Sequence, residues 1–461
     1  MSTRPVPRSG AGLTARLAGV VAATHTRRIQ PALERMIRNG FIDTAAVMLA
    51  AREEAVTRIV RGWVESRSGG AAHARILFGE TRVGARDAAL VNGTAAHALD
   101  YDDVGLQGHP SAVLVPALLA EGERSHASGR QLIAAYVTGF EVWAELIARE
   151  RGLHHLKGWH PTGIFGTVAS AAAVAGLRGL SDEQAWHALG LAASMAAGLT
   201  ANFGSMAKPF HAGRAAAAGI DAVDLAQAGM TAAPDVLEHP KGFLVAVSPE
   251  GQVDLDPPAD SYGEELRLAS IGLTIKKYPA CYAAHRVIDA MLDLVHAHDV
   301  QPDQVDRVEV TVGPAQASML RNRRPMNALE AKFSMQFAVA AALVARACGL
   351  AQLSDEFVVR PEVQALFELV EVHTVDTRHP TEPTLAKSDR VRIYLKDGRC
   401  LDSGEVFAAR GDASCPLGDK ELIRKFEDCT RTLPLAWRNR LLANLLALPD
   451  APDVSRLVPG T

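Results

Sequence analysis

Long alanine-rich tracts with helical spacing are the feature that most constrains how this chain can fold. They begin near residue 86 and follow one another to about residue 228, separated by Gly or polar turns. The hydrophobic share is 48%, but aromatic residues make up only 5%, so the core must be built mainly from small side chains. Alanine has the highest helix propensity, and small side chains let helices pack closely. The sequence therefore predicts a mainly α protein with a large all-helical domain.

Helices in this region are expected where apolar residues recur every three or four positions. Their predicted ranges are 86–99, 111–127, 131–149, 163–177, 182–197 and 209–228. Ser181 directly precedes one of them, and its side-chain oxygen is suited to capping the free backbone N–H groups of the first turn.

The sequence changes character after about residue 265, where β-branched residues become frequent. Strands are predicted at 266–276, 305–312, 369–375 and 390–395, with helices at 283–297 and 331–347 between them. Lys-Asp-Gly-Arg at 396–399 is typical of a hairpin turn. The expected domains are a disordered tail at 1–12, a helical domain at 13–265, a smaller α+β domain at 266–410, and C-terminal helices at 411–461 that return to the helical domain.

Charge and cysteine content exclude several classes of partner. The 48 basic and 52 acidic residues are well mixed and give a net charge of −4, so no long-range field attracts nucleic acid or anionic lipid. No segment offers the ~20 uninterrupted apolar residues of a membrane helix. The five cysteines are scattered without a CxxC spacing. We therefore expect a soluble, cytoplasmic protein in which any anion site is local.

Three basic residues each stand directly before a proline that opens a helical stretch: His109, His160 and Lys208. Proline is tolerated in the first helical turn, and it pushes the preceding residue out of the helical conformation. Each basic side chain is therefore expected near a helix cap, beside free N–H groups and the positive end of the helix dipole. This arrangement suits a carboxylate. The alternative is an ordinary helix start with a solvated or buried histidine.

Lys208, His211 and Arg214 are spaced three residues apart, so they should lie on one side of the helix. Three cations on one stripe repel one another, and they make better sense facing an anionic ligand. A salt-bridged surface face is the alternative.

The segment from His97 to Asp103 ends a helix with an acidic cluster, which is unfavourable at the negative end of the helix dipole. A divalent metal held by His97, Asp100 and Asp103 is one interpretation. We favour the other, in which a carboxylate orients or ionises a neighbouring histidine and no metal is bound.

Lys276, Lys277 and Tyr278 leave a predicted strand just before a helix. A lysine there can reach a second carboxylate of a ligand, although the residues alone favour a surface lysine pair. The chain contains no GxGxxG, P-loop, GxSxG or HExxH pattern, which argues against nucleotide, serine-hydrolase and zinc-protease chemistry.

Six segments, taken in order, resemble the MmgE/PrpD family, which includes 2-methylcitrate dehydratases, cis-aconitate decarboxylases and iminodisuccinate epimerases. They are NGTAAHALDYDD (92–103), HPSAVLVPALLA (109–120), GWHPTGIFGTVASAAAVAGL (158–177), MAKPFHAGRAAAAG (206–219), KKYPACYAAH (276–285) and AKFSMQF (331–337). The resemblance spans about 85–340 and is specific because the motifs keep their order.

The resemblance implies a large all-helical domain, a smaller lid domain, a homodimer and an active site in the cleft between domains without metal or organic cofactor. The catalytic positions that it implies are Asp100, His109, His160, Lys208 and Lys276. Substrate contacts are expected from a further set: His97, His211, Arg214, Lys277 and Tyr278.

Two positions depart from the decarboxylase-like members of the family. Val104 stands where they have a threonine, and Phe337 stands where they have a catalytic tyrosine. Loss of that phenol removes a candidate proton donor, so cis-aconitate decarboxylation is not the activity that we expect first.

The resemblance implies that a proton is removed next to a carboxylate, with His160 and His109 as general base and general acid in either order. The first hypothesis is a hydro-lyase acting on a hydroxy-tricarboxylate similar to 2-methylcitrate. The second is an epimerase or isomerase of a substituted dicarboxylate such as iminodisuccinate. The third is a carboxylate-binding protein without catalysis.

Overall fold

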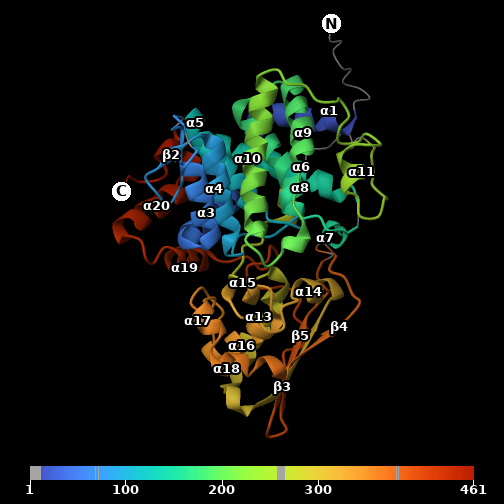
Figure 1. The fold of residues 1–461 in the computed structure, drawn as a ribbon, viewed down its shortest axis with the longest axis vertical. Helices are drawn as coiled ribbons and strands as arrows, with labels where there is room; N and C mark the ends of the chain where they lie inside the picture. Colours follow the sequence, from blue (N-terminus) through green and yellow to red (C-terminus); the bar gives the residue numbers. More distant parts are fainter. Residues whose placement is uncertain are drawn as a thin grey trace. The chain divides into compact units, whose positions relative to one another are not determined.

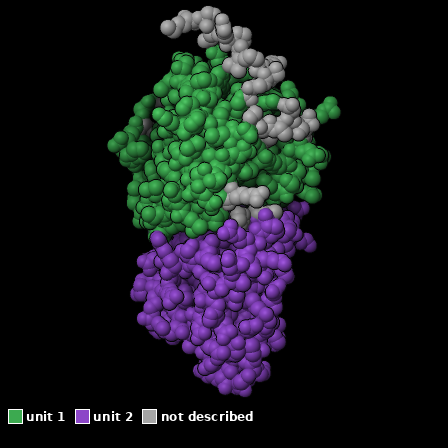
Figure 2. All heavy atoms as spheres, turned by 90° about the vertical axis from the view of Figure 1, so that its right-hand side faces the viewer, with its two compact units in different colours: residues 1–98, 105–273, 426–461 green, residues 99–104, 274–425 purple. Residues whose placement is uncertain are grey.

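The computed structural model describes residues 12–67, 69–70, 72–150, 152–256, 265–380, 382 and 384–460. The chain forms two compact units, coloured separately in Figure 2. Unit 1 comprises residues 1–98, 105–273 and 426–461, and unit 2 comprises residues 99–104 and 274–425. Apart from Gly12, the tail predicted at 1–12 lies outside the described residues.

Unit 1 is built almost entirely from helices (Figure 1). They are α1 (Leu13–Ala22), α2 (Pro31–Ala50), α3 (Ala55–Glu65), α4 (Ala85–Ala98), α5 (Pro110–Ser125), α6 (Gly129–Ala148), α7 (His154–Lys157), α8 (Pro161–Arg178), α9 (Asp182–Met195), α10 (Ala207–Gln227), α11 (Phe243–Val247), α12 (Arg267–Ile271) and α20 (Leu435–Leu446). A short antiparallel ribbon of β1 (Ala74–Arg75) and β2 (Arg82–Val83) also belongs to it. The predicted mainly helical fold is confirmed.

Local sequence signals explain where several of these helices begin. Ser181 accepts a hydrogen bond from the backbone N–H of Gln184, while the Gln184 side chain accepts one from the backbone N–H of Ser181, which confirms the predicted cap. Pro110 and Pro161 occupy the first helical position of α5 and α8, so His109 and His160 are N-cap residues as predicted.

Lys208 was wrongly predicted to precede its helix. Helix α10 begins at Ala207, and Lys208 already lies inside the first turn. Pro209 does not prevent this, because backbone N–H groups of the first turn have no intrahelical acceptor and the missing N–H costs nothing there.

Glycines allow the central helices of unit 1 to approach closely (Figure 1). A Cβ atom added at Gly93 of α4 would lie 2.8 Å from the Cα of Gly213 in α10. One added at Gly219 of α10 would lie 2.6 Å from the backbone nitrogen of Ala171 in α8. Helix α10 therefore packs against both neighbours at nearly backbone-to-backbone distance, as the alanine-rich tracts predicted.

Unit 2 combines a four-stranded sheet of order β4-β3-β5-β6 with several helices. The strands are β3 (Val305–Val312), β4 (Val370–Thr374), β5 (Arg390–Leu395) and β6 (Cys400–Asp402). Strand β3 is parallel to β4 and antiparallel to β5, and β5 is antiparallel to β6. The helices are α13 (His285–His298), α14 (Pro314–Met319), α15 (Ala328–Ala331), α16 (Met335–Ala345), α17 (Asp355–Val358), α18 (Pro361–Gln364) and α19 (Asp419–Cys429), the last of which continues past residue 425 into unit 1.

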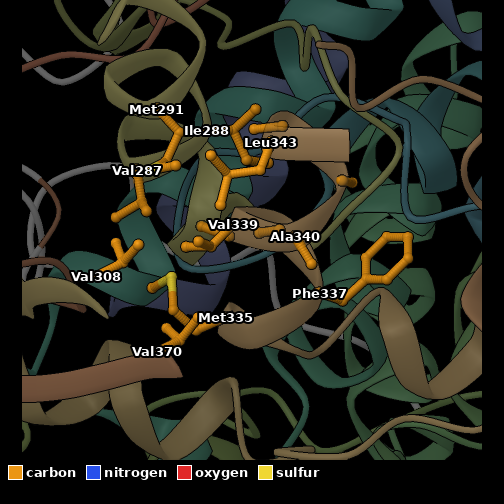
Figure 3. Close-up of a cluster of buried hydrophobic side chains, with 14 of the residues drawn as sticks. Val287, Ile288, Met291, Val308, Met335, Phe337, Val339, Ala340, Leu343 and Val370 are labelled. Carbon is orange, nitrogen blue, oxygen red and sulfur yellow. The ribbon is translucent and has the colours of Figure 1, made fainter. Parts of the chain in front are cut away.

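One face of this sheet and helices α13 and α16 form a continuous apolar core. Figure 3 shows Val308 of β3 and Val370 of β4 near Met335 of α16, with Ile288 of α13 in the same cluster. The strands predicted from alternating valines are confirmed, because Val308, Val310 and Val312 are fully buried and the residues between them are only partly buried.

The strand predicted at 266–276 is wrong. Residues Arg267–Ile271 form helix α12, because Glu141 of α6 accepts the backbone N–H groups of Arg267 and Leu268 at 3.0 and 2.9 Å. These bonds also keep α12 in unit 1, so the boundary between the units falls after Leu273 rather than after residue 265. The predicted hairpin turn is confirmed, since Leu395 and Arg399 bond across it before β6.

The other predicted limit, at residue 410, also differs from the structure, where unit 2 runs to Lys425. Segment 99–104 was expected in the helical domain and instead belongs to unit 2. The backbone N–H of Val104 donates to Thr274 O at 2.9 Å, which pairs this segment with the start of the longer part of unit 2.

Within the described ranges, no helix combines the length and the apolar character needed to cross a membrane.

Replacing Gly213 by alanine is expected to lower the free energy of unfolding by roughly 1–3 kcal/mol or more, because the added methyl meets the rigid backbone of α4. Its nearest neighbours are Leu90 O, the Thr94 side chain and, at 2.7 Å, the Thr94 backbone nitrogen. Denaturant unfolding checks this.

The matched control is Gly62→Ala in α3, where an added Cβ meets nothing within 4 Å. Alanine there should leave stability unchanged or raise it by up to about 1 kcal/mol. Equal destabilisation by both variants would contradict the close crossing of α4 and α10.

Candidate active site

Four histidines from separate helices of unit 1 come together, and we call them the histidine group: His97, His109, His160 and His211. The His97 ring centroid lies 4.3 Å from that of His109 and 5.8 Å from that of His160. The Nδ1 atoms of His160 and His211 are 3.1 Å apart, so one of them carries the proton that joins the pair. All four side chains are buried or nearly so.

The ends of four helices meet at this group. His97 lies in the last turn of α4, His109 and His160 cap the starts of α5 and α8, and His211 lies near the start of α10. Three positive helix ends thus surround the imidazoles, which favours bound negative charge. Gly198, with φ of +147°, lets the chain pass against this pair, since a Cβ there would lie 3.3 Å from His211 Nδ1.

Burial and neighbouring charge keep the pair neutral. Burial lowers the pKa of His160 well below its ordinary value, and His97 and Lys208 lower it further. Burial, followed by the charges of Lys208 and Arg214, lowers the pKa of His211 to about 4. At neutral pH both imidazoles therefore hold an unprotonated nitrogen.

Lys208 is buried beside the histidine group. Its Nζ lies 5.3 Å from the centroid of the Phe203 ring, and the same ring makes an edge contact with His160 at 5.0 Å. Arg214 influences the histidine group through its charge, which helps to lower the pKa of His211. Its guanidinium donates to Met195 O at 2.8 Å and so caps the end of α9.

The remaining catalytic candidates lie in unit 2 and pair with each other. Lys276 Nζ is 3.2 Å from Asp100 Oδ1 and donates to Asp100 O at 2.8 Å. Both side chains are almost fully buried. Asp100 has a φ of +51°, in the left-handed region, so the chain turns sharply here and brings its carbonyl and carboxylate to one ammonium. Lys276 thus compensates the charge of Asp100, one of the three aspartates in the acidic cluster.

A second buried lysine, Lys425 of α19, holds the segments that carry this pair. Its Nζ donates to Tyr101 O at 2.8 Å and to Lys276 O at 2.7 Å, and it lies 3.8 Å from the centroid of the Tyr101 ring. Tyr101 in turn donates its hydroxyl to Lys277 O at 3.0 Å. Two ammoniums therefore share a buried region with the carboxylates of Asp100, Asp102 and Asp103.

Two predicted substrate contacts, Lys277 and Tyr278, also have protein partners. Lys277 Nζ lies 3.4 Å from a carboxylate oxygen of Glu421 at the partly exposed edge of unit 2. The Tyr278 hydroxyl donates to Asp289 at 2.5 Å, and burial together with that carboxylate raises the tyrosine pKa. Both residues support the Lys276 segment through contacts with their own unit.

Phe337, for which the resemblance implies a family tyrosine, is a core residue of unit 2. Figure 3 shows it with the other buried side chains of this unit, and it is 1% exposed. The centroid of its ring lies 6.2 Å from that of Phe357. The Phe337 side chain offers no polar atom for proton transfer. Val104, at the position of the family threonine, contributes the backbone pairing with Thr274.

On the sheet of unit 2, Glu309, Glu371 and His373 offer ligand atoms within 4.8 Å of one another. Glu309 already accepts the Tyr394 hydroxyl at 3.0 Å and pairs with Arg307 at 3.3 Å. Because these partners compensate its charge, we assign no metal to this cluster.

Comparison with known proteins identifies the family. The MmgE/PrpD N-terminal domain matches residues 15–256, and the MmgE/PrpD C-terminal domain matches residues 278–445. These matches cover most of the chain, which therefore belongs to the MmgE/PrpD family.

Several curated relatives carry the name cis-aconitate decarboxylase. The Homo sapiens protein is 30% identical over 390 residues, which is 81% of this chain and 79% of that protein. The Mus musculus protein is 28% identical over 391 residues, covering 81% of this chain and 78% of its own. One from Aspergillus terreus is 27% identical over 383 residues, covering 75% and 74%.

Sequence reasoning missed Lys425 and Phe203. Lys425 follows Lys276 by 149 positions and stands in a charged amphipathic helix, where nothing distinguishes it from a surface lysine. Phe203 lies in a loop without periodicity. Only the folded chain shows that these side chains touch Lys276, His160 or Lys208.

Replacing Lys425 by methionine is expected to lower the free energy of unfolding by about 1–3 kcal/mol, because Tyr101 O and Lys276 O lose a buried charged donor. Urea unfolding followed by circular dichroism measures the change. Lys420→Met, an exposed lysine of the same helix, is the control and should have little effect. Equal stability of the two variants would contradict the anchoring role.

The unfolding temperature should fall as the pH is lowered from 7 toward 4. Burial lowers the pKa of His154 and of His211 from 6.5 to about 4, so the unfolded chain binds protons that the folded chain rejects. This contribution is complete above pH 6.5 and is lost progressively below it. His154→Leu should flatten the pH dependence measured by calorimetry, whereas His73→Ala, at an exposed position, should not.

Proposed function

We propose that this chain is a cofactor-independent lyase that acts on a small di- or tricarboxylate by removing a proton next to a carboxylate. Its first candidate reaction is the dehydration of a hydroxy-tricarboxylate similar to 2-methylcitrate. Membership of the MmgE/PrpD family and the names of the decarboxylase relatives support a lyase acting on polycarboxylates.

The observation that carries this proposal is the histidine group beside Lys208. His160 and His211 are neutral and so have a lone pair able to accept a proton, while Lys208 and three helix starts supply fixed positive charge. A bound polycarboxylate would offset the cations that depress the pKa of His160, so its basicity should rise when the substrate is present. The base is thereby strengthened by the anion on which it acts.

Dehydration needs a base and an acid. One imidazole removes the proton from carbon, the electron pair forms the alkene, and the departing hydroxyl takes a proton and leaves as water. His160 and His109 are the candidates for these two roles, in either order. Negative charge that spreads onto the neighbouring carboxylate requires a cation, for which we propose Lys208. Lys276, which pairs with Asp100 in unit 2, stays a further catalytic candidate.

Two other reactions use the same groups. Decarboxylation of cis-aconitate is favoured by the names of the relatives, and the apolar Phe337 weighs against it because no phenol is available there. Epimerisation of a dicarboxylate such as iminodisuccinate needs proton removal and return without a leaving group, so it does not require that phenol.

The deciding experiment incubates the purified chain separately with 2-methylcitrate, cis-aconitate and iminodisuccinate in heavy water. Ultraviolet absorbance reports a new conjugated alkene, carbon dioxide release reports decarboxylation, and proton NMR reports exchange at carbon. We expect alkene formation from 2-methylcitrate. Release of carbon dioxide from cis-aconitate would identify a decarboxylase in place of the dehydratase. Proton exchange at carbon without a new alkene would identify an epimerase.

Replacing His160 by alanine should reduce kcat at least about 100-fold, because a general base typically contributes that much. His73→Ala, an exposed histidine of unit 1, is the control and should retain full activity. If no candidate is turned over, yet a tricarboxylate still raises the unfolding temperature of both variants, the chain is a binding protein and the catalytic proposal fails.

A further inference from the structure

His285 at the start of α13 is a buried histidine that the mechanism above does not use. Its side chain is 0% exposed, and its Nε2 lies 3.1 Å from Ala280 O. A carbonyl oxygen only accepts, so Nε2 carries the hydrogen and donates it. The neutral ring therefore holds its lone pair on Nδ1.

Nδ1 of His285 is buried and has no hydrogen-bond partner among the residues that the structure describes. A buried acceptor without a donor costs about 1–3 kcal/mol, so folded proteins rarely keep one without a function or a bound molecule. This atom is therefore a place where something outside the described chain is expected to donate a hydrogen bond.

The ring is held rigidly by two tyrosines. Its centroid lies 5.3 Å from that of Tyr278 and 5.0 Å from that of Tyr282. Each tyrosine is fixed in turn, because Tyr278 donates to Asp289 and Tyr282 donates to Asp412 at 2.6 Å. Held in this way, the imidazole cannot easily turn to satisfy Nδ1 elsewhere, and the acceptor is preorganised for a ligand.

The neighbouring charges indicate what kind of ligand this is. After burial, the ammonium of Lys276 is the largest influence on His285, whose pKa falls to about 3, and Asp100 and Lys425 act on it as well. Lys276 keeps its ion pair with Asp100, so the site combines an ammonium held by the protein with a buried nitrogen acceptor. A carboxylate satisfies the cation but is repelled by the lone pair, whereas a hydroxyl group can donate to it.

We propose that Nδ1 of His285 accepts a hydrogen bond from the hydroxyl group of a hydroxy-polycarboxylate whose adjacent carboxylate is bound by Lys276. This proposal rests on the proposed function and deepens it, because it makes His285 a specificity-determining residue. It distinguishes a hydroxy acid from its deoxy analogue. A hydroxy acid carries both a carboxylate for the ammonium and a hydroxyl group for the acceptor.

Citrate and tricarballylate test the proposal, since they differ only by the hydroxyl group. Calorimetric titration of the full chain should show citrate binding at least about 10-fold more tightly, as expected for one additional hydrogen bond. His285→Gln keeps an amide N–H to reach Ala280 O but lacks the second nitrogen. In that variant citrate should bind more weakly and tricarballylate with unchanged affinity, so the preference for citrate should disappear.

His296→Gln, at an exposed position of α13, is the matched control and should retain the preference. The proposal is overturned if wild type binds both ligands equally, if neither ligand binds, or if His285→Gln keeps the preference. Binding is measured without turnover. If the chain prefers citrate to tricarballylate but shows no enzymatic activity, only the proposed function is refuted. Activity that does not depend on His285 refutes only this inference.

A spectroscopic measurement on the unaltered chain covers the case in which the variant does not fold. With ¹⁵N-labelled histidine, the His285 Nδ1 signal should be that of an unprotonated nitrogen. Citrate should shift it in the direction of hydrogen-bond acceptance, and tricarballylate should not. An Nδ1 signal that is protonated, or that responds alike to both ligands, would show a purely structural histidine, with any buried donor being water.

Discussion

Close packing of alanine- and glycine-rich helices is the constraint on which unit 1 depends. Gly93 and Gly213 let α4 and α10 touch almost backbone to backbone, and Gly219 does the same for α10 and α8. Large side chains at these points would separate the helices by several ångströms. The histidine group exists only because the ends of these helices meet, so the small residues of the core control the spacing of the polar residues at its edge.

Electrostatics gives the two sets of candidate residues different characters. Burial and nearby cations lower the pKa of His160 and His211 in unit 1, which leaves these two imidazoles neutral and able to accept a proton. In unit 2, Lys276 and Lys425 share one buried region with three aspartates, Asp100, Asp102 and Asp103. Burying cations in this way is costly unless carbonyls and carboxylates surround them, and both lysines use backbone carbonyls for this purpose.

The sequence predicted much of this local structure because the signals involved act over short distances. The starts of α5 and α8 followed from Pro110 and Pro161, and the strand at 305–312 followed from alternating valines. The error at 266–276 has a tertiary cause: Glu141, more than a hundred residues away, supplies the acceptors that begin α12. No local pattern contains that information.

Family membership and the helical character of the chain were determined by the sequence alone, because ordered motifs, apolar periodicity and proline positions are properties of neighbouring residues. Tertiary structure decided which groups meet: it paired Asp100 with Lys276, anchored both through Lys425, and left Nδ1 of His285 as a buried acceptor. Hydrogen bonds and charge interactions act over a few ångströms in space, and residues separated by 149 or 176 positions come within that range only when the chain has folded.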